Sequence, residues 1–240
     1  MKKLVPLTVI ICLWQLLSFS KNISQIPSFI DIGDGTLQVL AEVETYIDFG
    51  ETIIRTLVSF FASALLGIGI GVLISISKNW KPELLNVVHF FRSIPAPALL
   101  PFFMSIFGLY YGPKLAFAIF VCSLVNVIYV YYAIEGVKSL RLVHFYQILN
   151  VRKFTLYIRV ILPASWSGIL SGLKVSLSLS LVLTVLAEYV LLTGNGIGGS
   201  IRMNYEDQEY NQMYALIILL GLLGYILNRW LDNLDGSNRI

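Results

Sequence analysis

Charged residues are scarce in this chain of 240 residues, where Lys, Arg, Asp and Glu together make up 13%. A soluble domain carries about a quarter of its residues as charges, and half that share leaves too little polar surface to face water. Apolar residues make up 57% of the chain, and the mean hydropathy is +0.77. The composition therefore predicts a protein whose solvent is largely lipid.

Cysteine and histidine are also scarce. The two cysteines, Cys12 and Cys122, lie inside apolar runs, and the two histidines are His89 and His144. A disulfide framework or a metal centre needs more such residues at closer spacing, so we expect neither, and no cofactor. The net charge of +3 comes without a basic stretch interleaved with aromatic residues, so we expect no nucleic-acid partner.

Motifs that hold nucleotides are missing as well. Residues 194–200 are rich in glycine, but they lack the lysine with which a phosphate-binding loop reaches the phosphates. Gly67, Gly69 and Gly71 lie inside an apolar run with no strand before them, which favours close helix packing over a dinucleotide site. Neither histidine lies deep within an apolar run, which disfavours an intramembrane hydrolase. We therefore do not expect this chain to be an enzyme by itself.

The sequence does contain a series of long apolar runs, at residues 4–20, 52–77, 85–107, 114–133, 167–192 and 213–230. A helix needs about 20 apolar residues to cross the hydrocarbon core, because every backbone polar group must be satisfied internally. The runs predict an all-α polytopic membrane protein with about six transmembrane helices. Pro95, Pro97 and Pro101 interrupt the third run, so we expect a kink or an irregular segment there.

Lysine and arginine cluster between alternate runs. They precede the first run, follow the second at 78–84 and fill 134–166, whereas 21–51 and 193–212 are mainly acidic. Because cytoplasmic loops retain positive charge, both termini, 78–84 and 134–166 are predicted to face the cytoplasm. A signal peptide is the alternative for the first run, although residues 18–20 form a poor cleavage site.

Ionisable groups inside apolar runs are candidates for function, because they are expensive in hydrocarbon. Lys174 and Glu188 share one helix face of the fifth run. At about 1.5 Å per residue they lie about 21 Å apart, too far for an ion pair between the two. Glu188 is a candidate for a face that lines the bundle interior, with a position at the outer interface as the alternative.

The segment 134–166 is long for a loop between membrane helices, and it is rich in apolar residues. These fall near helical spacing in two sets, Leu142, Ile148 and Leu149, and Phe154, Tyr157 and Ile161. The spacing predicts short amphipathic helices that lie on lipid or fit a groove on a partner protein.

Several short motifs follow one another along the chain. They are Arg92-Ser93-Ile94-Pro95 with Pro101 and Phe107-Gly108, then Leu162-Pro163, then Ala187-Glu188 with Gly196-Ile197-Gly198. In order and spacing they resemble the permease subunits of type I ABC importers, in the branch that serves nitrate, taurine, alkanesulfonates and related small molecules. The resemblance covers residues 52–230 and implies a type I importer permease core.

The resemblance also implies roles for individual residues. The family's usual Glu-Ala-Ala falls here on His144, Phe145 and Tyr146. We expect a compensating groove on the ATPase, with weakened coupling as the alternative. Asparagine is the residue that tolerates a left-handed turn second best after glycine, so the bend at the family's usual glycine can survive at Asn150. The residues expected to couple to the ATPase are His144, Phe145, Tyr146, Asn150, Arg152, Lys153, Leu162 and Pro163. Those expected to line or shape the pathway are Arg92, Pro95, Pro101, Glu188, Gly196 and Gly198.

The implied function is the membrane pathway of an ABC importer in the cell inner membrane. The expected partners are ATP-binding subunits on separate chains, a second permease subunit (identical or paralogous), an extracytoplasmic solute-binding protein and membrane lipid. We expect a first helix and an acidic outer segment in 1–50, a five-helix core with its coupling loop in 51–232, and a cytoplasmic tail in 233–240. The solute is expected to be a sulfonate, nitrate, taurine, or a small organic or vitamin-precursor compound. An ion-coupled secondary transporter is the alternative; it predicts paired intramembrane carboxylates or repeated halves.

Overall fold

The computed structural model describes residues 5–19, 25–77, 81–140, 152–191 and 195–234. Every regular element within these ranges is a helix, which confirms the predicted all-α class. The outer helices are α1 (Val5–Ser18), α2 (Phe29–Ala41), α4 (Lys81–Ser93), α5 (Ala96–Phe107), α11 (Ile197–Glu206) and α12 (Tyr210–Leu234).

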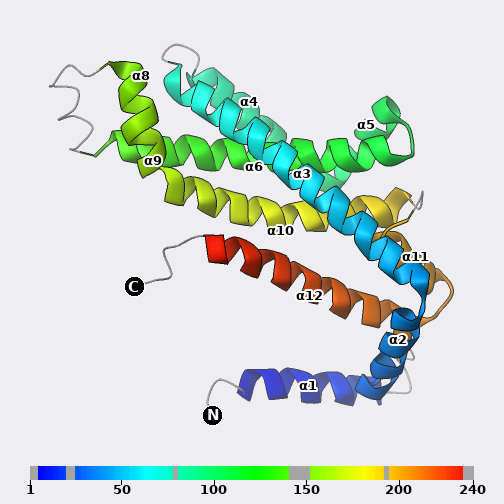
Figure 1. Ribbon diagram of the computed structural model, residues 1–240. Helices are drawn as coiled ribbons and strands as arrows, with labels where there is room; N and C mark the ends of the chain where they lie inside the picture. Colours follow the sequence, from blue (N-terminus) through cyan, green and yellow to red (C-terminus); the bar gives the residue numbers. More distant parts are fainter. Residues whose placement is uncertain (1–4, 20–24, 78–80, 141–151, 192–194, 235–240) are drawn as a thin grey trace.

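Three long helices form the centre of the bundle: α3 (Val43–Ile76), α6 (Tyr111–Lys138) and α10 (Trp166–Leu191). Each packs on the other two, and α3 runs obliquely across both (Figure 1). Their buried faces carry hydroxyl-bearing side chains as well as apolar ones, for example Ser59 and Ser63 in α3 and Ser176 and Ser180 in α10. Lipid gives helices no hydrophobic reason to associate, so small side chains that let backbones approach closely are what hold such a bundle.

The contact between α3 and α6 depends on two glycines. A Cβ atom at Gly71 would lie 2.8 Å from the Cβ of Val130, and one at Gly67 would overlap the Cβ of Asn126. A Cβ at Gly69 would meet nothing within 4 Å. The predicted close packing is therefore confirmed at Gly67 and Gly71 and is wrong at Gly69.

Among the described residues, four helices are long and apolar enough to cross a bilayer: α3, α6, α10 and α12. The predicted third run is split into α4 and α5, which form an angle of 97°. Pro95 lies at this corner as the N-cap of α5, and a proline disfavours helical geometry in the residue before it. The predicted kink is thus confirmed, and the bent pair makes a fifth crossing if it is counted as one span. The first predicted run forms α1, whose 14 residues fall short of the about 20 that a crossing needs.

Two central helices extend beyond the apolar runs that predicted them. α3 begins at Val43 rather than at residue 52, and α6 continues to Lys138 rather than ending at 133. The added turns carry Asp48, Glu51 and Glu135, which bind partners within the protein, so their charge does not end the helix. Residues 134–138 therefore belong to a membrane helix and not to the loop predicted at 134–166.

The described remainder of that segment is helical. α8 (Lys153–Leu156), a π-helical turn η1 (Tyr157–Ile161) and α9 (Leu162–Ala164) lead into α10. Leu156 and Ile161 are buried in the same apolar cluster as Ile134 of α6, whereas Ile158 is exposed. The segment 152–164 is thus amphipathic as predicted, but its buried side includes Leu156, and Tyr157 of the predicted set is half-buried. The other predicted set, Leu142, Ile148 and Leu149, lies outside the described residues. The predicted coupling residues His144, Phe145, Tyr146 and Asn150 lie outside the described residues.

The two ends of the bundle carry different elements. The start of α1 and the end of α12 lie on the same side as α8, whereas α2 and α11 gather at the other side (Figure 1). We refer to these as the α8 end and the α11 end. This arrangement agrees with the alternation of sides that the charges predict.

Candidate functional sites in the helix bundle

Glu188 of α10 is the most deeply buried acidic group of the α11 end, at 1% exposure. Its Oε1 accepts from Nη1 of Arg55 at 2.7 Å, and its Oε2 accepts from Oγ1 of Thr52 at 2.8 Å, both from α3. The backbone N–H of Gly198 donates to Oε2 at 3.2 Å. Glu188 therefore ties α10 to α3 and to the start of α11, and the interior position predicted for it is confirmed over the interfacial one.

Arg55 is the counterpart of Glu188 and is itself 3% exposed. Beyond Glu188 it donates to Oε2 of Glu51 at 2.8 Å and to the carbonyl oxygen of Asn195 at 2.6 Å. The guanidinium also lies over the ring of Tyr111, 4.8 Å from its centroid, which is a cation–π contact. Such additional bonds offset the cost of burying an ion pair, although Nε of Arg55 has no hydrogen-bond partner among the described residues.

Glycine is required where the chain turns into α11. Gly196 has a φ of +146°, a region that L side chains rarely adopt, and a Cβ there would lie 2.6 Å from either carboxylate oxygen of Glu188. A Cβ at Gly198 would lie 2.8 Å from the Cβ of Glu188. The three predicted residues Glu188, Gly196 and Gly198 thus form one site, in which Gly196 makes room for the carboxylate and Gly198 for the backbone of α10.

Asp48 and Thr52 complete the turn into α11. Oδ1 of Asp48 accepts from the N–H of Gly196 at 2.8 Å, its Oδ2 accepts from the hydroxyl of Ser200, and Oγ1 of Thr52 accepts from the N–H of Ile197 at 3.0 Å. The first N–H groups of a helix have no partner within the helix, so α3 supplies acceptors for them.

Sequence reasoning missed Asp48 and Thr52. The available signal was a polar stripe in an apolar helix, since positions 48, 52, 55, 59 and 63 are three or four apart and fall on one face.

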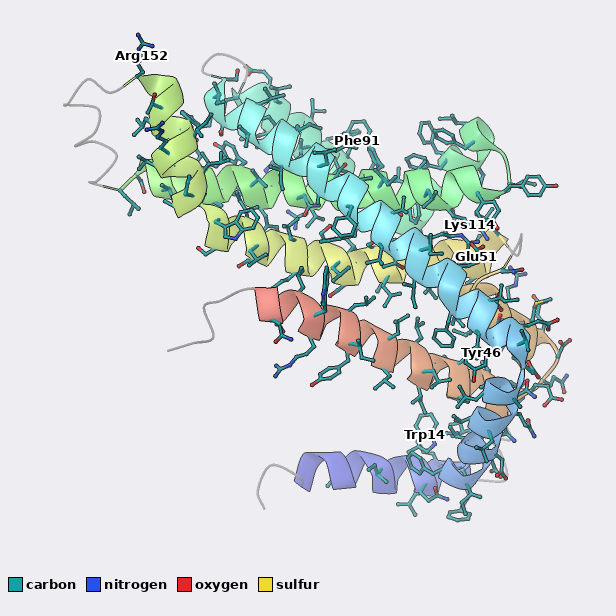
Figure 2. All side chains as sticks on the ribbon, in the orientation of Figure 1. Trp14, Tyr46, Glu51, Phe91, Lys114 and Arg152 are labelled. Atoms are coloured by element: carbon teal, nitrogen blue, oxygen red, sulfur yellow. The ribbon has the colours of Figure 1, made fainter. Side chains whose placement is uncertain are left out.

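A second cation and a cavity border this cluster. Lys114 at the start of α6 is 2% exposed, and Figure 2 shows it at the same end of the bundle as Glu51. A cavity of about 570 Å³ opens beside the cluster, lined by Glu44, Ile47, Asp48, Asn195, Gly196, Gly199, Ser200 and Met203. The α11 end thus combines the buried ion pair of Arg55 and Glu188 with an acidic mouth, the cavity lined by Glu44 and Asp48.

Arg92 lies in a separate groove of about 410 Å³ between α4, α6 and α10. The lining is Arg92, Val125, Ile128, Tyr129, Tyr132, Ala133, Gly168 and Ser171. Within the part of the chain that the structure describes, the Arg92 side chain has no ion pair or hydrogen bond. An arginine in a membrane helix is costly unless it faces a partner or water. A guanidinium beside hydroxyl-bearing side chains in a groove can hold a small anion.

The remaining predicted residues have the following places in the structure. Pro95 begins α5 and Pro101 lies inside it. Lys174 pairs with Asp232 of α12 at 2.9 Å. Arg152 is exposed, and Figure 2 shows it projecting from the α8 end of the bundle. Leu162 and Pro163 form the first two residues of α9.

The comparison with known proteins decides the family. Residues 46–240 match the family described as binding-protein-dependent transport system inner membrane component. The chain belongs to this family. It is a multi-pass inner-membrane permease subunit of an ABC importer, as the resemblance implied.

Relatives extend the match over almost the whole chain. The nitrate import permease NrtB of Synechocystis sp. is 26% identical over 244 residues, which cover 96% of this chain and 86% of that protein. The putative aliphatic sulfonates transport permease SsuC of Bacillus subtilis is 25% identical, covering 98% and 85%. Among solved structures, the inward-facing MetNI methionine ABC transporter has a chain that superposes with a TM-score of 0.70 at 20% identity, covering 81% and 95%. This last likeness shows that the two chains share a fold.

The buried pair makes a prediction about stability. Removing the charge in Glu188→Gln leaves Arg55 without its buried partner, which is expected to lower the free energy of unfolding by about 3 kcal/mol. Glu206→Gln is the matched control, because Glu206 pairs with Arg202 on an exposed helix face and contributes less than about 1 kcal/mol. Chemical unfolding in detergent micelles, followed by helical circular dichroism, measures both. Equal losses for the two variants would contradict the assignment.

Proposed function

We propose that this chain is one of two permease subunits that enclose the pathway of an ABC importer, with the α8 end facing the cytoplasm and docking an ATPase on a separate chain. The observation that carries the proposal is the segment 152–164. Its apolar side chains Leu156 and Ile161 are held in the bundle, while Arg152 and Ile158 stay exposed. A short helix anchored on one face and free on the other is suited to a groove on a partner.

The orientation follows from the charges. The start of α1, which Lys2 and Lys3 precede in the sequence, lies at the α8 end, as does the segment that carries Arg152 and Arg159. Retained positive charge marks the cytoplasmic side. The α11 end then faces outward, where Glu44 and Asp48 line the 570 Å³ cavity. A solute-binding protein that presents basic side chains complements this mouth.

For the solute we propose a small anion. Relatives of similar length are named for nitrate and for aliphatic sulfonates. Independently, the groove between α4, α6 and α10 presents Arg92 with tyrosine and serine side chains in its lining. A pathway that crosses the bundle there gives an anion a cation to meet as it leaves the binding protein for the cytoplasm.

The decisive experiment is purification followed by reconstitution. The tagged chain is purified from membranes of its native cell, and a nucleotide-binding ABC subunit is expected to accompany it. In proteoliposomes with that subunit and the binding protein, uptake of labelled nitrate or alkanesulfonate is expected to require ATP. Uptake that needs no ATPase and collapses with a proton ionophore would instead establish ion-coupled secondary transport.

The anion groove is tested by substitution. Arg92→Gln keeps a polar, unbranched side chain but removes its charge, and uptake is expected to fall about tenfold or more, because a bond to a charged group is lost. Arg92→Lys is expected to retain part of the rate. Arg202→Gln changes a partly exposed arginine of the α11 end; it is the control and is expected to leave uptake unchanged. Uptake by Arg92→Gln at the control's rate would rule out this groove as the anion site.

A further inference from the structure

One backbone carbonyl at the α8 end accepts hydrogen bonds from two other elements. The carbonyl oxygen of Ser75, in the last turn of α3, accepts from the hydroxyl of Tyr157 in η1 at 3.1 Å and from Nζ of Lys138 in α6. Carbonyls in the last turn of a helix have no partner within the helix, and a lysine there also complements the helix dipole. The bonds therefore satisfy an acceptor that α3 itself leaves open.

The same group of side chains reaches a fourth element. Glu135 of α6 bridges Lys138 at 2.7 Å and Lys81 of α4 at 2.6 Å. Nζ of Lys138 also lies over the ring of Tyr157, 5.0 Å from its centroid. We call Ser75, Lys81, Glu135, Lys138 and Tyr157 the inner clasp. It joins the ends of α3, α4 and α6 to the segment that enters α10.

Tyr157 occupies a special place in that segment, because it opens the π-helical turn. The N–H of Leu162 donates to the carbonyl of Tyr157, five residues back, and Pro163 has no N–H to continue an ordinary helical ladder. π-helical turns are rare and are often found at functional sites. Tyr157 thus bonds to α3 from the place where the segment departs from an ordinary α-helix.

From these contacts we propose that Tyr157 is a positioning residue that carries the movement of the ATPase-docking segment into α3 and α6. The inference rests on the proposed function of that segment. Movement reaches α10 directly, because α9 ends at Ala164 and α10 begins at Trp166. α3 and α6 are far from the segment in sequence and must receive the movement through contacts. They then move together, because Gly67 and Gly71 lock them backbone to backbone.

The hydroxyl of Tyr157 is the part to remove. In the complete complex in proteoliposomes, Tyr157→Phe keeps the ring and its packing but loses the bond to Ser75. The number of solute molecules taken up per ATP hydrolysed is expected to fall about threefold to tenfold, the range for one lost hydrogen bond, while ATP hydrolysis continues. Tyr225→Phe is the control, since Tyr225 is exposed on α12, and it is expected to keep the wild-type ratio.

The ratio separates transmission from folding. A variant that merely folds less well loses uptake and ATP hydrolysis in parallel, so its ratio of uptake to hydrolysis stays at the wild-type value. That result for Tyr157→Phe would overturn the inference, and so would uptake at the wild-type rate. Lys138→Gln tests the other donor to the carbonyl of Ser75. It is also expected to lower the number of solute molecules taken up per ATP hydrolysed. If no ATPase accompanies the chain and uptake needs no ATP, the proposed function itself has failed, and this outcome differs from an ATP-driven complex with an unchanged ratio.

Discussion

Arg55 and Glu188 approach to 2.7 Å and are both almost fully buried, so removing either charge is costly for the other. Three elements set their geometry at once, because Thr52, Asn195 and Gly198 supply further bonds; Nε of Arg55 has no hydrogen-bond partner among the described residues. α3, α10 and the turn into α11 must therefore be in place together before the pair is satisfied. This condition selects one packing of the helices at the α11 end, where apolar contacts in lipid would select none.

Further contacts fix the helices relative to one another between the α11 end and the α8 end. α3 and α6 are held together at Gly67 and Gly71, and the inner clasp then joins both to the ATPase-docking segment. We call α3, α6 and α10 the three-helix body. The buried network around Arg55 and Glu188 and the inner clasp thus lie at its opposite ends. When the ATPase displaces the docking segment, the whole body is expected to move without bending. A displacement at one face of the membrane can then open and close the pathway at the other face.

Much of this was predictable from the sequence, for physical reasons that also set its limits. Apolar runs and basic clusters gave the all-α class, and the motif order brought Glu188, Gly196 and Gly198 into one hypothesis. Hydropathy placed the start of α3 too late, because Asp48 and Glu51 look like solvent-facing charges until their partners are known. Gly69 looked equivalent to Gly67 and Gly71, since a sequence does not show which face meets α6. Tyr157 looked like one apolar contact of an amphipathic helix, because its acceptor is a backbone carbonyl that no side-chain pattern records.

The most direct test of the central claim, that the docking segment and the three-helix body move as one, is a distance measured within one subunit. Spin labels at Ile76 of α3 and Ile158 of η1, both exposed, are placed in a variant whose Cys12 and Cys122 are replaced by serine. Pulsed electron resonance then reports their separation in the complex with and without bound ATP. Movement as one body predicts the same distance distribution in both states. A distribution that shifts on ATP binding would show that the segment slides past α3, and would contradict it.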